Sequence, residues 1–429
     1  MRAPVHPFAQ QENALYTSVA VFLLGAIALV VESGYSGGAA LLFLGGIYSL
    51  FKRPVLALSR EDKLVLGVLV AFGLVQIFDL LIHEGGTRHL DKPLRFILAT
   101  LIFTVMRKYP PRLSWLWAGL AVGGILTATW AGYQKLFLQA ERALGYTHVI
   151  QFGNIAMLTG LFCLAGLGWA GAQPQRRIWL PLLVAGAVGG ILGSLFSGSR
   201  GGWVGLPLVL LVLYRAYSEY FSRRMRIMAP TLVVVAVVFV YNVPQLGVQE
   251  RVHAAFNDIS LYKQGDPDTS LGARFEMWRA ASQLALSKPL LGWGEVNYDA
   301  ALRSLVERGK AHEIVTNFGH PHNEFLNAAA KRGLLGVLAL LALYLVPLRQ
   351  FAGGLRSPNL TQRSLATAGT LLSVAYVDFG LSQAFFSHNS GVMVYSVWLI
   401  VLWGCYRNEC EATAAGRTSS PATHADRSP

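Results

Sequence analysis

Long apolar stretches alternate with short polar segments along most of the chain. Twelve of these stretches approach the roughly 20 residues that a helix needs to cross about 30 Å of hydrocarbon. They lie at residues 15–32, 35–51, 63–82, 93–106, 114–132, 153–171, 178–196, 202–218, 227–243, 333–348, 364–384 and 390–406. A helix satisfies its own backbone hydrogen bonds inside a membrane. The pattern therefore predicts an all-α polytopic membrane protein with about twelve transmembrane helices.

One polar interval is much longer than the others. Residues 244–332 separate the ninth and tenth apolar stretches, and we expect them to form a large loop that contains helices. The chain then divides into nine spans in residues 1–243, this loop, three spans in residues 333–407 and a tail at residues 408–429. The tail is rich in small and polar residues, a composition that predicts disorder.

The charged residues indicate topology rather than a charged partner. Hydrophobic residues make up 53% of the 429 residues and charged residues only 14%, which excludes an ordinary soluble enzyme. The net charge of +13 does not predict nucleic-acid binding, because Lys and Arg lie in short loops on alternate sides. With a cytoplasmic N-terminus, 20 Lys and Arg residues fall in inside segments and 6 in short outside loops. Both termini are therefore expected inside, and the long loop outside.

The turn between the seventh and eighth stretches, LFSGSRGGWVGL at residues 195–206, contains Arg200. Its glycines allow backbone N–H groups to approach a ligand closely, and the next helix begins there with its positive end exposed. Both features suit an anion. A lone Arg at this depth also serves commonly as a turn cap or a lipid-headgroup contact. Because the charge rule disfavours Arg on the outside, we favour a functional role for Arg200.

Residues 269–294, TSLGARFEMWRAASQLALSKPLLGWG, predict a partly amphipathic helix in the long loop that ends before Pro289. Arg274 lies near the start of this helix, beside Gly272, which makes it a candidate anion ligand. Arg279 lies further along and fits a solvated charge equally well. The helix as a whole also fits a position on the membrane surface.

The stretch GHPHNEFLNAAAKRGLLG, residues 319–336, places two histidines before the tenth apolar stretch. Pro321 suits a first helical position, so we expect His322 in the first turn, where the positive helix end keeps an imidazole neutral. A neutral imidazole accepts a proton, although a histidine at a helix start is also commonly a cap. If the helix is continuous, both glycines lie on the His322 face and pack closely on a neighbouring helix. This face carries Phe325, Leu326, Ala329, Gly333 and Gly336.

Two other patterns resemble functional sites but have simpler explanations. His320, His322 and Glu324 resemble a metal site, but a zinc site usually needs three converging ligands and Pro321 restricts that convergence. The Asp-Pro-Asp sequence at 266–268 resembles the acidic pair of nucleotide-sugar transferases, but it favours a turn before a helix cap at the next residue. The long loop contains no cysteine, so no disulfide or Cys-based metal site is predicted there.

Together, the three stretches around Arg200, Arg274 and His322 resemble the O-antigen ligase family of bacterial membrane glycosyltransferases, which is related to the O-antigen polymerases. The ligase signature is a His followed by Asn, Ser or Gln, then nine residues and Gly-x-x-Gly. Here it reads His322-Asn323, nine further residues and Gly-Leu-Leu-Gly at 333–336. The resemblance covers the whole topology. It also includes the Ser-x-Ser-Arg-Gly-Gly turn at 197–202 and the Gly-x-Arg-x-x-x-Trp start at 272–278.

The resemblance implies a GT-C-like helical fold in the bacterial inner membrane, with the long loop in the periplasm. It implies transfer of an O-antigen polysaccharide from undecaprenyl diphosphate to a hydroxyl of lipid A-core, with inversion and without a metal or other cofactor. The expected partners are then this lipid-linked donor, the lipid A-core acceptor and membrane lipids. The base is expected to be His322, and the diphosphate ligands Arg200 and Arg274. Weaker supporting candidates are His320, Asn323 and Arg279.

Several alternatives stay open. An O-antigen polymerase or a protein O-oligosaccharyltransferase uses a similar donor. A secondary transporter also fits twelve spans, but its charges usually gather near the midplane, where Asp79 and Asp378 are the main candidates here. A flippase or scaffold binds the lipid-linked sugar without chemistry. Arg88, Arg95 and Trp293 are possible acceptor-binding residues, but their spacing along the chain does not favour this role.

Overall fold

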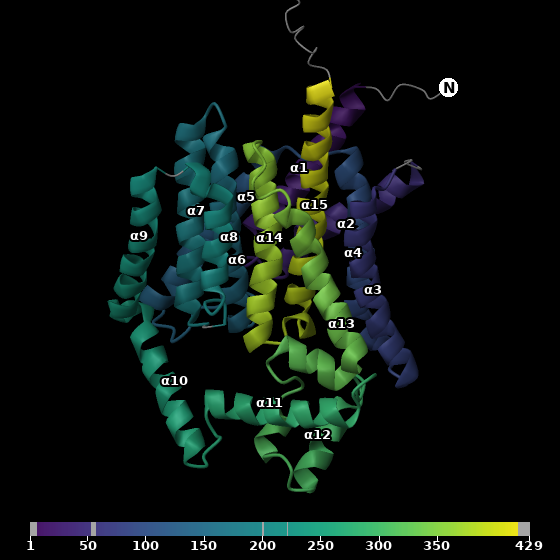
Figure 1. Cartoon of the computed structure of the whole chain (residues 1–429), viewed down its shortest axis with the longest axis vertical. Coiled ribbons are helices and arrows are strands. Elements are labelled where there is room, and N and C mark those ends of the chain that lie inside the picture. Colours follow the sequence, from purple (N-terminus) through teal and green to yellow (C-terminus); the bar gives the residue numbers. More distant parts are fainter. Residues whose placement is uncertain (1–6, 53–56, 200, 221, 419–429) are drawn as a thin grey trace, which may run out of the picture.

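The computed structural model describes residues 7–52, 57–199, 201–220 and 222–418, which fold almost entirely into helices (Figure 1). In these ranges the backbone forms fifteen α-helices and five short 3-10 helices, and no strand. The α-helices are α1 (Pro7–Ala26), α2 (Gly34–Phe51), α3 (Arg60–Ile82), α4 (Asp91–Lys108), α5 (Leu113–Leu136), α6 (Val149–Gly171), α7 (Arg176–Ser197), α8 (Leu206–Tyr217), α9 (Arg223–Asn242), α10 (Val248–Lys263), α11 (Ser270–Ser287), α12 (Tyr298–Glu307), α13 (Glu324–Ala352), α14 (Leu360–Ser382) and α15 (Asn389–Thr418). The 3-10 helices are η1 (Thr87–Leu90), η2 (Ser218–Tyr220), η3 (Pro244–Leu246), η4 (Glu313–Asn317) and η5 (Phe385–Ser387).

Each predicted apolar stretch overlaps one helix, from α1 to α9 and from α13 to α15. Within the described ranges, nine helices are long enough and apolar enough to cross a membrane: α2, α3, α5, α6, α7, α9, α13, α14 and α15. The other three, α1, α4 and α8, fall short of that length or apolarity, and α8 has only 12 residues. The prediction of an all-α polytopic membrane protein is confirmed.

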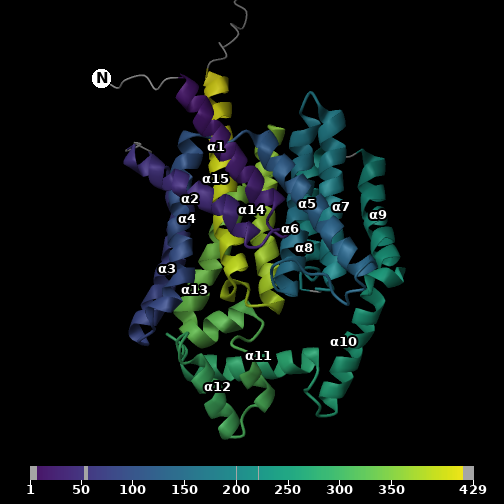
Figure 2. The ribbon, with the colours of Figure 1, turned by 180° about the vertical axis from the view of Figure 1, so that it is seen from behind.

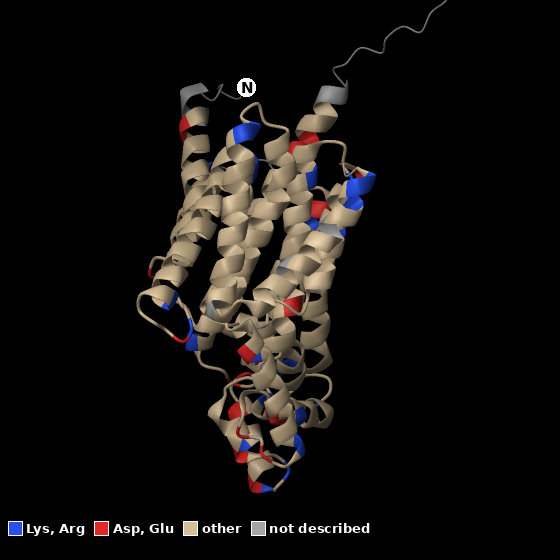
Figure 3. Ribbon diagram, turned by 90° about the vertical axis from the view of Figure 1, so that its left-hand side faces the viewer, with Lys and Arg blue, Asp and Glu red and all other residues tan. Residues whose placement is uncertain are grey.

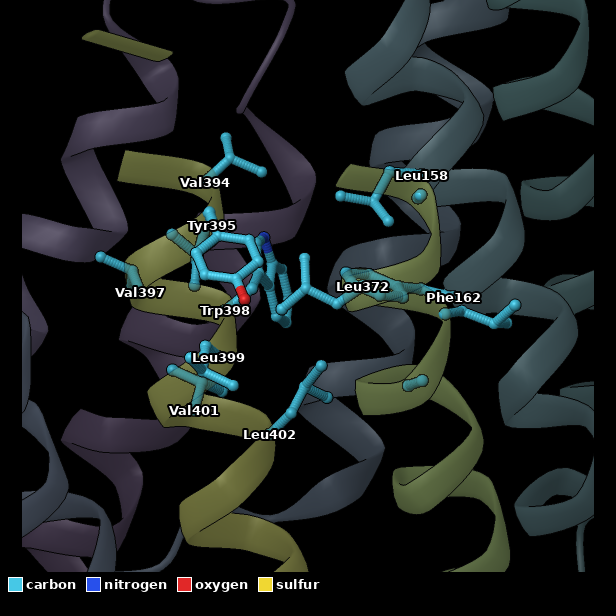
Figure 4. Packing of buried hydrophobic residues seen from close by; sticks show 14 of the residues in the cluster. Leu158, Phe162, Leu372, Val394, Tyr395, Val397, Trp398, Leu399, Val401 and Leu402 are labelled. Atoms are coloured by element: carbon cyan, nitrogen blue, oxygen red, sulfur yellow. The ribbon is translucent and has the colours of Figure 1, made fainter. Parts of the chain in front are cut away.

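The centre of the bundle is formed by α6, α14 and α15, most of whose residues are buried. Figure 4 shows Phe162 of α6 and Leu372 of α14 beside aromatic and aliphatic side chains of α15. The ring centroids of Phe162 and Trp398 lie 5.4 Å apart, and those of Tyr376 and Tyr395 lie 4.7 Å apart. Because lipid is as apolar as these side chains, close packing rather than exclusion of water holds such helices together.

Glycines let α5 and α7 approach each other closely. A Cβ atom on Gly124 of α5 would collide with the carbonyl group of Gly186, and one on Gly186 of α7 would collide with the backbone of Ala121. Small residues at a helix crossing allow the two backbones to touch. This crossing fixes α7 against the bundle before the turn that contains Arg200.

The two ends of the bundle differ. Figures 1 and 2 show the start of α1 and the end of α15 at one end, and α10, α11 and α12 at the other. In Figure 3, charged residues gather towards the two ends, whereas most of the ribbon between them carries no charge. The helices of the long loop therefore form a layer on the end opposite the termini.

A small second core holds this layer together. Met277 and Leu284 of α11 pack with Tyr298 and Leu302 of α12, and Ala330 of α13 belongs to the same buried cluster. Side chains from three helices thus share one apolar interior outside the main bundle. As a result, α11 is fixed against the beginning of α13.

The prediction that the tail is disordered from residue 408 is wrong for its first part, because α15 continues to Thr418. Polar contacts with neighbouring segments hold this extension. The Arg107 side chain hydrogen bonds to Asn408 and Glu411, and Asn408 Nδ2 donates to the carbonyl of Met106 at 2.9 Å. The amide group of Asn359 donates to the Thr413 hydroxyl at 3.0 Å. Residues 419–429 of the predicted tail lie outside the described residues.

Candidate active site

His322 lies just before α13 rather than in its first turn. The helix begins at Glu324, and Asn323 is its N-cap, with Oδ1 accepting from the backbone N of Leu326 at 3.0 Å. Asn323 Nδ2 also donates to the carbonyl of Leu381 at 3.2 Å, at the end of α14. The prediction that Pro321 is the first helical residue is therefore wrong, because the Asn323 side chain satisfies a free helix N–H group that Pro cannot. His322 itself has a left-handed backbone, with φ of 48°.

The glycine pair of the signature does not face a neighbouring helix as expected. Gly333 has φ 57° and ψ −151°, a conformation that is essentially restricted to glycine, and it kinks α13. A Cβ atom at Gly333 would collide with the backbone of Leu290. At the kink, the backbone N of Leu334 donates to the carbonyl of Pro289 at 2.7 Å. The loop after α11 therefore packs into the break in α13, and the helix is not continuous.

Arg274 is positioned by the start of α11. The Thr269 hydroxyl caps this helix by accepting from the backbone N of Gly272 at 3.1 Å. Before the cap, the backbone N of Asp268 donates to Asp266 Oδ1 at 2.9 Å, which confirms that the Asp-Pro-Asp sequence forms a turn. Arg274 thus lies on the first turns of a helix that is fixed at its N-terminus and packed on α13.

Arg274 and His322 line the same cavity. It has a volume of about 520 Å³ and lies between α11, the segment before α13 and the turn after α7. Ser199 and Gly201 line it too, so the residues on both sides of Arg200 contribute to its wall. Arg200 lies outside the described residues. We call this space the α11–α13 cavity, and its other lining residues include Arg142, Arg251, Asp258 and Ser382.

The described wall of the α11–α13 cavity has more cationic than anionic side chains. Three guanidinium groups, from Arg142, Arg251 and Arg274, line it together with two aspartates. Arg142 Nε donates to the carbonyl of Ser197 at 2.9 Å, and Arg251 pairs with Glu141 at 3.1 Å. Guanidinium groups bind phosphate oxygens bidentately and stay protonated. The cavity therefore suits an anionic ligand such as a diphosphate.

Four histidines cluster beside this cavity. The ring centroids of His320 and His322 lie 4.5 Å apart, and those of His320 and His388 lie 5.4 Å apart. His148 is stacked on His388 with a centroid distance of 6.5 Å. Within this group, His320 and His322 come from the predicted stretch, whereas the other two come from the ends of other helices. The fold thus surrounds the predicted base with further imidazole groups.

Burial keeps these rings uncharged, because a buried cation loses its hydration. It lowers the pKa of His322 to about 4 and that of His320 to about 3. The pKa of His388 falls to about 4 for the same reason. At His322 the charge of Arg274 adds to the shift, which places the two side chains near each other. His322 is therefore neutral at pH 7 and able to accept a proton.

Gln383 supports the His322 ring. Its side chain hydrogen bonds to His322 and raises the pKa of that ring, which makes the ring the donor. Gln383 Oε1 also accepts from the backbone N of Ala384 at 3.1 Å. His322 Nδ1 is buried and has no hydrogen-bond partner among the described residues.

An ion-pair network fixes the loop that carries the histidines. Lys331 Nζ donates to Glu295 Oε1 at 2.8 Å and to the carbonyl of Gly319 at 3.2 Å. Arg332 pairs with Glu295 at 2.7 Å and with Asp79 of α3 at 3.3 Å. Although burial opposes ionisation, Lys331 and Arg332 hold the pKa of Glu295 well below its usual range. The network thus joins α3, the loop after α11 and α13.

The weaker site candidates have different surroundings. His320 belongs to the histidine cluster, and Asn323 has the capping contacts described above. The Arg279 side chain is 62% exposed, lies 3.8 Å from Glu276 Oε1 and does not line the α11–α13 cavity. Its alternative interpretation as a solvated charge fits this position better than a role as an anion ligand.

The alternative metal site does not form in the part of the chain that the structure describes. There, no three His, Cys, Asp or Glu side chains are grouped to hold a metal ion. Glu324 instead accepts a hydrogen bond from the backbone N of Phe386 at 2.8 Å and is buried on the other side of the α13 start. Metal independence of the reaction stays a prediction.

The chain is similar to one family model and to individual known proteins. Residues 185–341 match the family model described as O-antigen ligase. An uncharacterized protein of Haemophilus influenzae is 28% identical over 389 residues, which are 90% of this chain and 97% of that protein. An O-antigen ligase of Escherichia coli is 25% identical over 142 residues, which are 32% of this chain and 33% of that ligase.

Residues 185–341 are therefore similar to the O-antigen ligase superfamily. The matched region runs from α7 into α13 and includes the stretches of Arg200, Arg274 and His322. This similarity supports a ligase-type or polymerase-type function, a glycosyltransferase-type enzyme and a location in a bacterial membrane.

Three polar residues of the candidate site were missed in the sequence. His148, Gln383 and His388 all lie outside the region that matches the family model. Gln383 and His388 lie in the segment SQAFFSHNSG between the last two spans. The polar residues of this short segment were the only sequence feature that could have indicated them. No spacing along the chain relates them to His322. Only the packing of α13 against α14 brings them together.

Proposed function

We propose that the chain is an O-antigen ligase, which transfers O-antigen polysaccharide from undecaprenyl diphosphate to a sugar hydroxyl of lipid A-core. His322 is the general base, and Arg274 and Arg200 hold the diphosphate. The observation that carries this proposal is the shared cavity, whose wall contains His322, Arg274 and the two neighbours of Arg200. These groups come from three distant parts of the chain.

The reaction is a single displacement. The acceptor hydroxyl oxygen attacks C1 of the donor sugar, and the bond from C1 to the diphosphate oxygen breaks on the opposite face, which inverts the anomeric centre. The hydroxyl proton passes to the imidazole of His322, which lines the α11–α13 cavity. A positioned base of this kind typically contributes about 10² to 10⁴-fold to the rate.

The leaving diphosphate gains negative charge as the bond breaks. Two guanidinium groups can neutralise that charge without a metal ion, because each donates two hydrogen bonds in a fixed geometry and cannot lose its proton. The cationic wall of the α11–α13 cavity supports this role. Since the charge develops in the transition state, these contacts lower the barrier as well as bind the donor.

The reaction is placed at the periplasmic face of the inner membrane. The excess of Lys and Arg in the segments that share a side with the termini supports cytoplasmic termini. The cavity is lined by residues of α10 and α11. These loop helices lie at the end opposite the termini (Figures 1 and 2). In this orientation, a lipid-linked donor reaches the cavity from the outer leaflet.

The test is a reaction with purified full-length protein, lipid-linked O-antigen and lipid A-core, with a chelator present. Attachment of the polysaccharide to lipid A-core supports the proposal. Longer lipid-linked chains without this product indicate a polymerase, and a glycosylated protein acceptor indicates an O-oligosaccharyltransferase. Donor binding without any product indicates a carrier, and loss of transfer in chelator removes the metal-free mechanism.

A further inference from the structure

A second cavity, of about 100 Å³, lies between α3, α4 and the beginning of α13. Its walls include Gln76 of α3, Arg88 of η1, Lys92 of α4 and Asn327 of α13. No residue that lines this cavity also lines the α11–α13 cavity, so the two spaces are distinct. We call it the α3–α4 cavity.

Two buried amide side chains in this wall have polar atoms without partners. Gln76 is 8% exposed and Asn327 is 3% exposed. Among the described residues, neither Nε2 of Gln76 nor Oδ1 of Asn327 has a hydrogen-bond partner. The first is a donor and the second an acceptor, and leaving such buried groups unpaired is costly. A hydroxyl group both donates and accepts, so a hydroxylated ligand satisfies both.

The cavity also has two cations without a direct ion pair among the described residues, although the charge of Glu295 acts on Lys92. In the described part of the chain, neither Lys92 nor Arg88 forms an ion pair, and Arg88 Nε donates to His89 at 3.1 Å. The acidic residues of the wall all have other partners, two of which also line this cavity. Asp91 pairs with Arg95, Glu295 pairs with Lys331 and Arg332, and Glu324 accepts from the backbone N of Phe386. Negative charge on the ligand is therefore favoured.

A single wall separates the two cavities. Phe386 and Ser387 line the α3–α4 cavity, and the next residue, His388, belongs to the histidine cluster. On α13, Glu324 lines the α3–α4 cavity two residues after His322, which lines the other cavity. The two cavities therefore lie on different sides of the segments that contain His322 and His388.

We propose that the α3–α4 cavity anchors a negatively charged sugar of the acceptor, through Lys92, Arg88 and the amides of Gln76 and Asn327. This inference rests on the proposed transfer reaction. The volume suits one phosphate group with an adjacent hydroxyl, and not a whole oligosaccharide. The rest of the acceptor therefore extends from the cavity towards His322. A phospholipid headgroup presents the same anionic chemistry, and the test separates the two sources.

The test compares wild type with Lys92→Gln, Arg88→Gln and the double variant, using full-length protein in phosphatidylcholine nanodiscs. Arg303→Gln, which removes an exposed cation on α12, is the matched control. We expect the double variant to raise the acceptor KM by roughly tenfold or more, because each lost contact is a charge-assisted hydrogen bond. The donor KM and the kcat at saturating acceptor stay unchanged, as do all parameters of Arg303→Gln.

A second acceptor identifies the charged group. With lipid A-core whose phosphates have been removed by phosphatase, wild type and the double variant should show the same KM. An unchanged KM of the double variant with untreated lipid A-core overturns the proposal, and so does an equal loss with both acceptors. Phosphatidylglycerol in the nanodiscs should leave the wild-type KM unchanged. Competition by that lipid through Lys92 and Arg88 would assign the cavity to a headgroup and also overturn the proposal.

Direct binding of lipid A-core, measured by titration without donor, keeps this inference separate from the proposed function. Binding by wild type that is lost in the double variant, with no transfer by either, supports the cavity assignment and removes the ligase assignment. If the double variant instead binds lipid A-core normally and still transfers the polysaccharide, the cavity assignment is wrong and the ligase assignment is supported.

Discussion

The Nε2 atoms of Gln383 and His388 lie 3.5 Å apart, and the same glutamine side chain hydrogen bonds to His322. Gln383 is 1% exposed and comes from the residue after α14, so its side chain has little freedom. It therefore connects the candidate base with the neighbouring histidine and orients the base by accepting a hydrogen bond from it. This arrangement makes Gln383 a positioning residue for His322.

Substitutions of Gln383 should move the acidic limb of the pH profile in opposite directions. The hydrogen bond that the His322 ring donates to Gln383 raises the His322 pKa, so Gln383→Leu lowers that pKa further and shifts the limb to lower pH. Gln383→Glu adds a negative charge beside the ring, which favours the imidazolium and shifts the limb to higher pH. The measurement is kcat/KM against pH for both variants. Loss of activity without opposite shifts would indicate a merely structural role.

Replacement of the base should remove chemistry and spare binding. We expect His322→Ala to lower kcat by about 10² to 10⁴-fold, the usual contribution of a general base. The Kd for undecaprenyl diphosphate-linked donor should stay within about twofold, because the imidazole is not the diphosphate ligand. His253→Ala, which removes an exposed histidine on α10, is the control and should retain full activity. Transfer at the wild-type rate in His322→Ala contradicts the base assignment.

Removal of the cavity guanidinium groups should weaken donor binding. Arg274→Ala and Arg200→Ala each lose charge-assisted hydrogen bonds to diphosphate, so we expect the donor Kd to rise by roughly tenfold or more and kcat to fall as well. Titration with undecaprenyl diphosphate measures the first effect. Arg279→Ala serves as a control, because this side chain is 62% exposed and outside the cavity lining. An equal effect of all three changes would indicate a general loss of surface charge.

The pH dependence should differ between the free and the donor-bound enzyme. Burial and the charge of Arg274 lower the pKa of His322 to about 4, so the free enzyme keeps a neutral base until the pH falls through about 4. Bound diphosphate brings negative charge next to Arg274 and His322, which raises the pKa of the base. The acidic limb of kcat should therefore lie at higher pH than that of kcat/KM. Coinciding limbs would mean that the diphosphate does not approach His322.

The kink at Gly333 should be necessary for the stability of this region. In Gly333→Ala the Cβ atom collides with the backbone of Leu290, and the backbone conformation is one that only glycine adopts readily. We expect a loss of at least ~1–3 kcal/mol, measured by denaturation in detergent. Gly67→Ala on α3 is the matched control, since nothing lies within 4 Å of the added methyl group. A stable Gly333→Ala protein would show that α13 can straighten.

The sequence alone determined the membrane architecture and the identity of the main site candidates. Apolar runs of membrane-spanning length have few alternatives to a helix, because lipid offers the backbone no hydrogen-bond partners. The turn at Asp266 to Asp268 and the cap at Thr269 were also predictable, because they depend only on neighbouring residues. Pro321 was predicted as the helix start from the same kind of local preference. The helix instead starts after Asn323, whose side chain caps it and also hydrogen bonds to the end of α14.

Only the tertiary structure decided which groups surround His322. Gln383, His388 and His148 reach the base from other helices, and such proximity depends on helix packing that leaves no periodic trace in the sequence. The kink at Gly333 likewise depends on the backbone of Leu290, which folds into it from the preceding loop. The disordered tail was a wrong prediction for residues 408–418, because composition carries no information about Arg107 on a distant helix. Local residue patterns thus specified the helices, and long-range contacts specified the cavity.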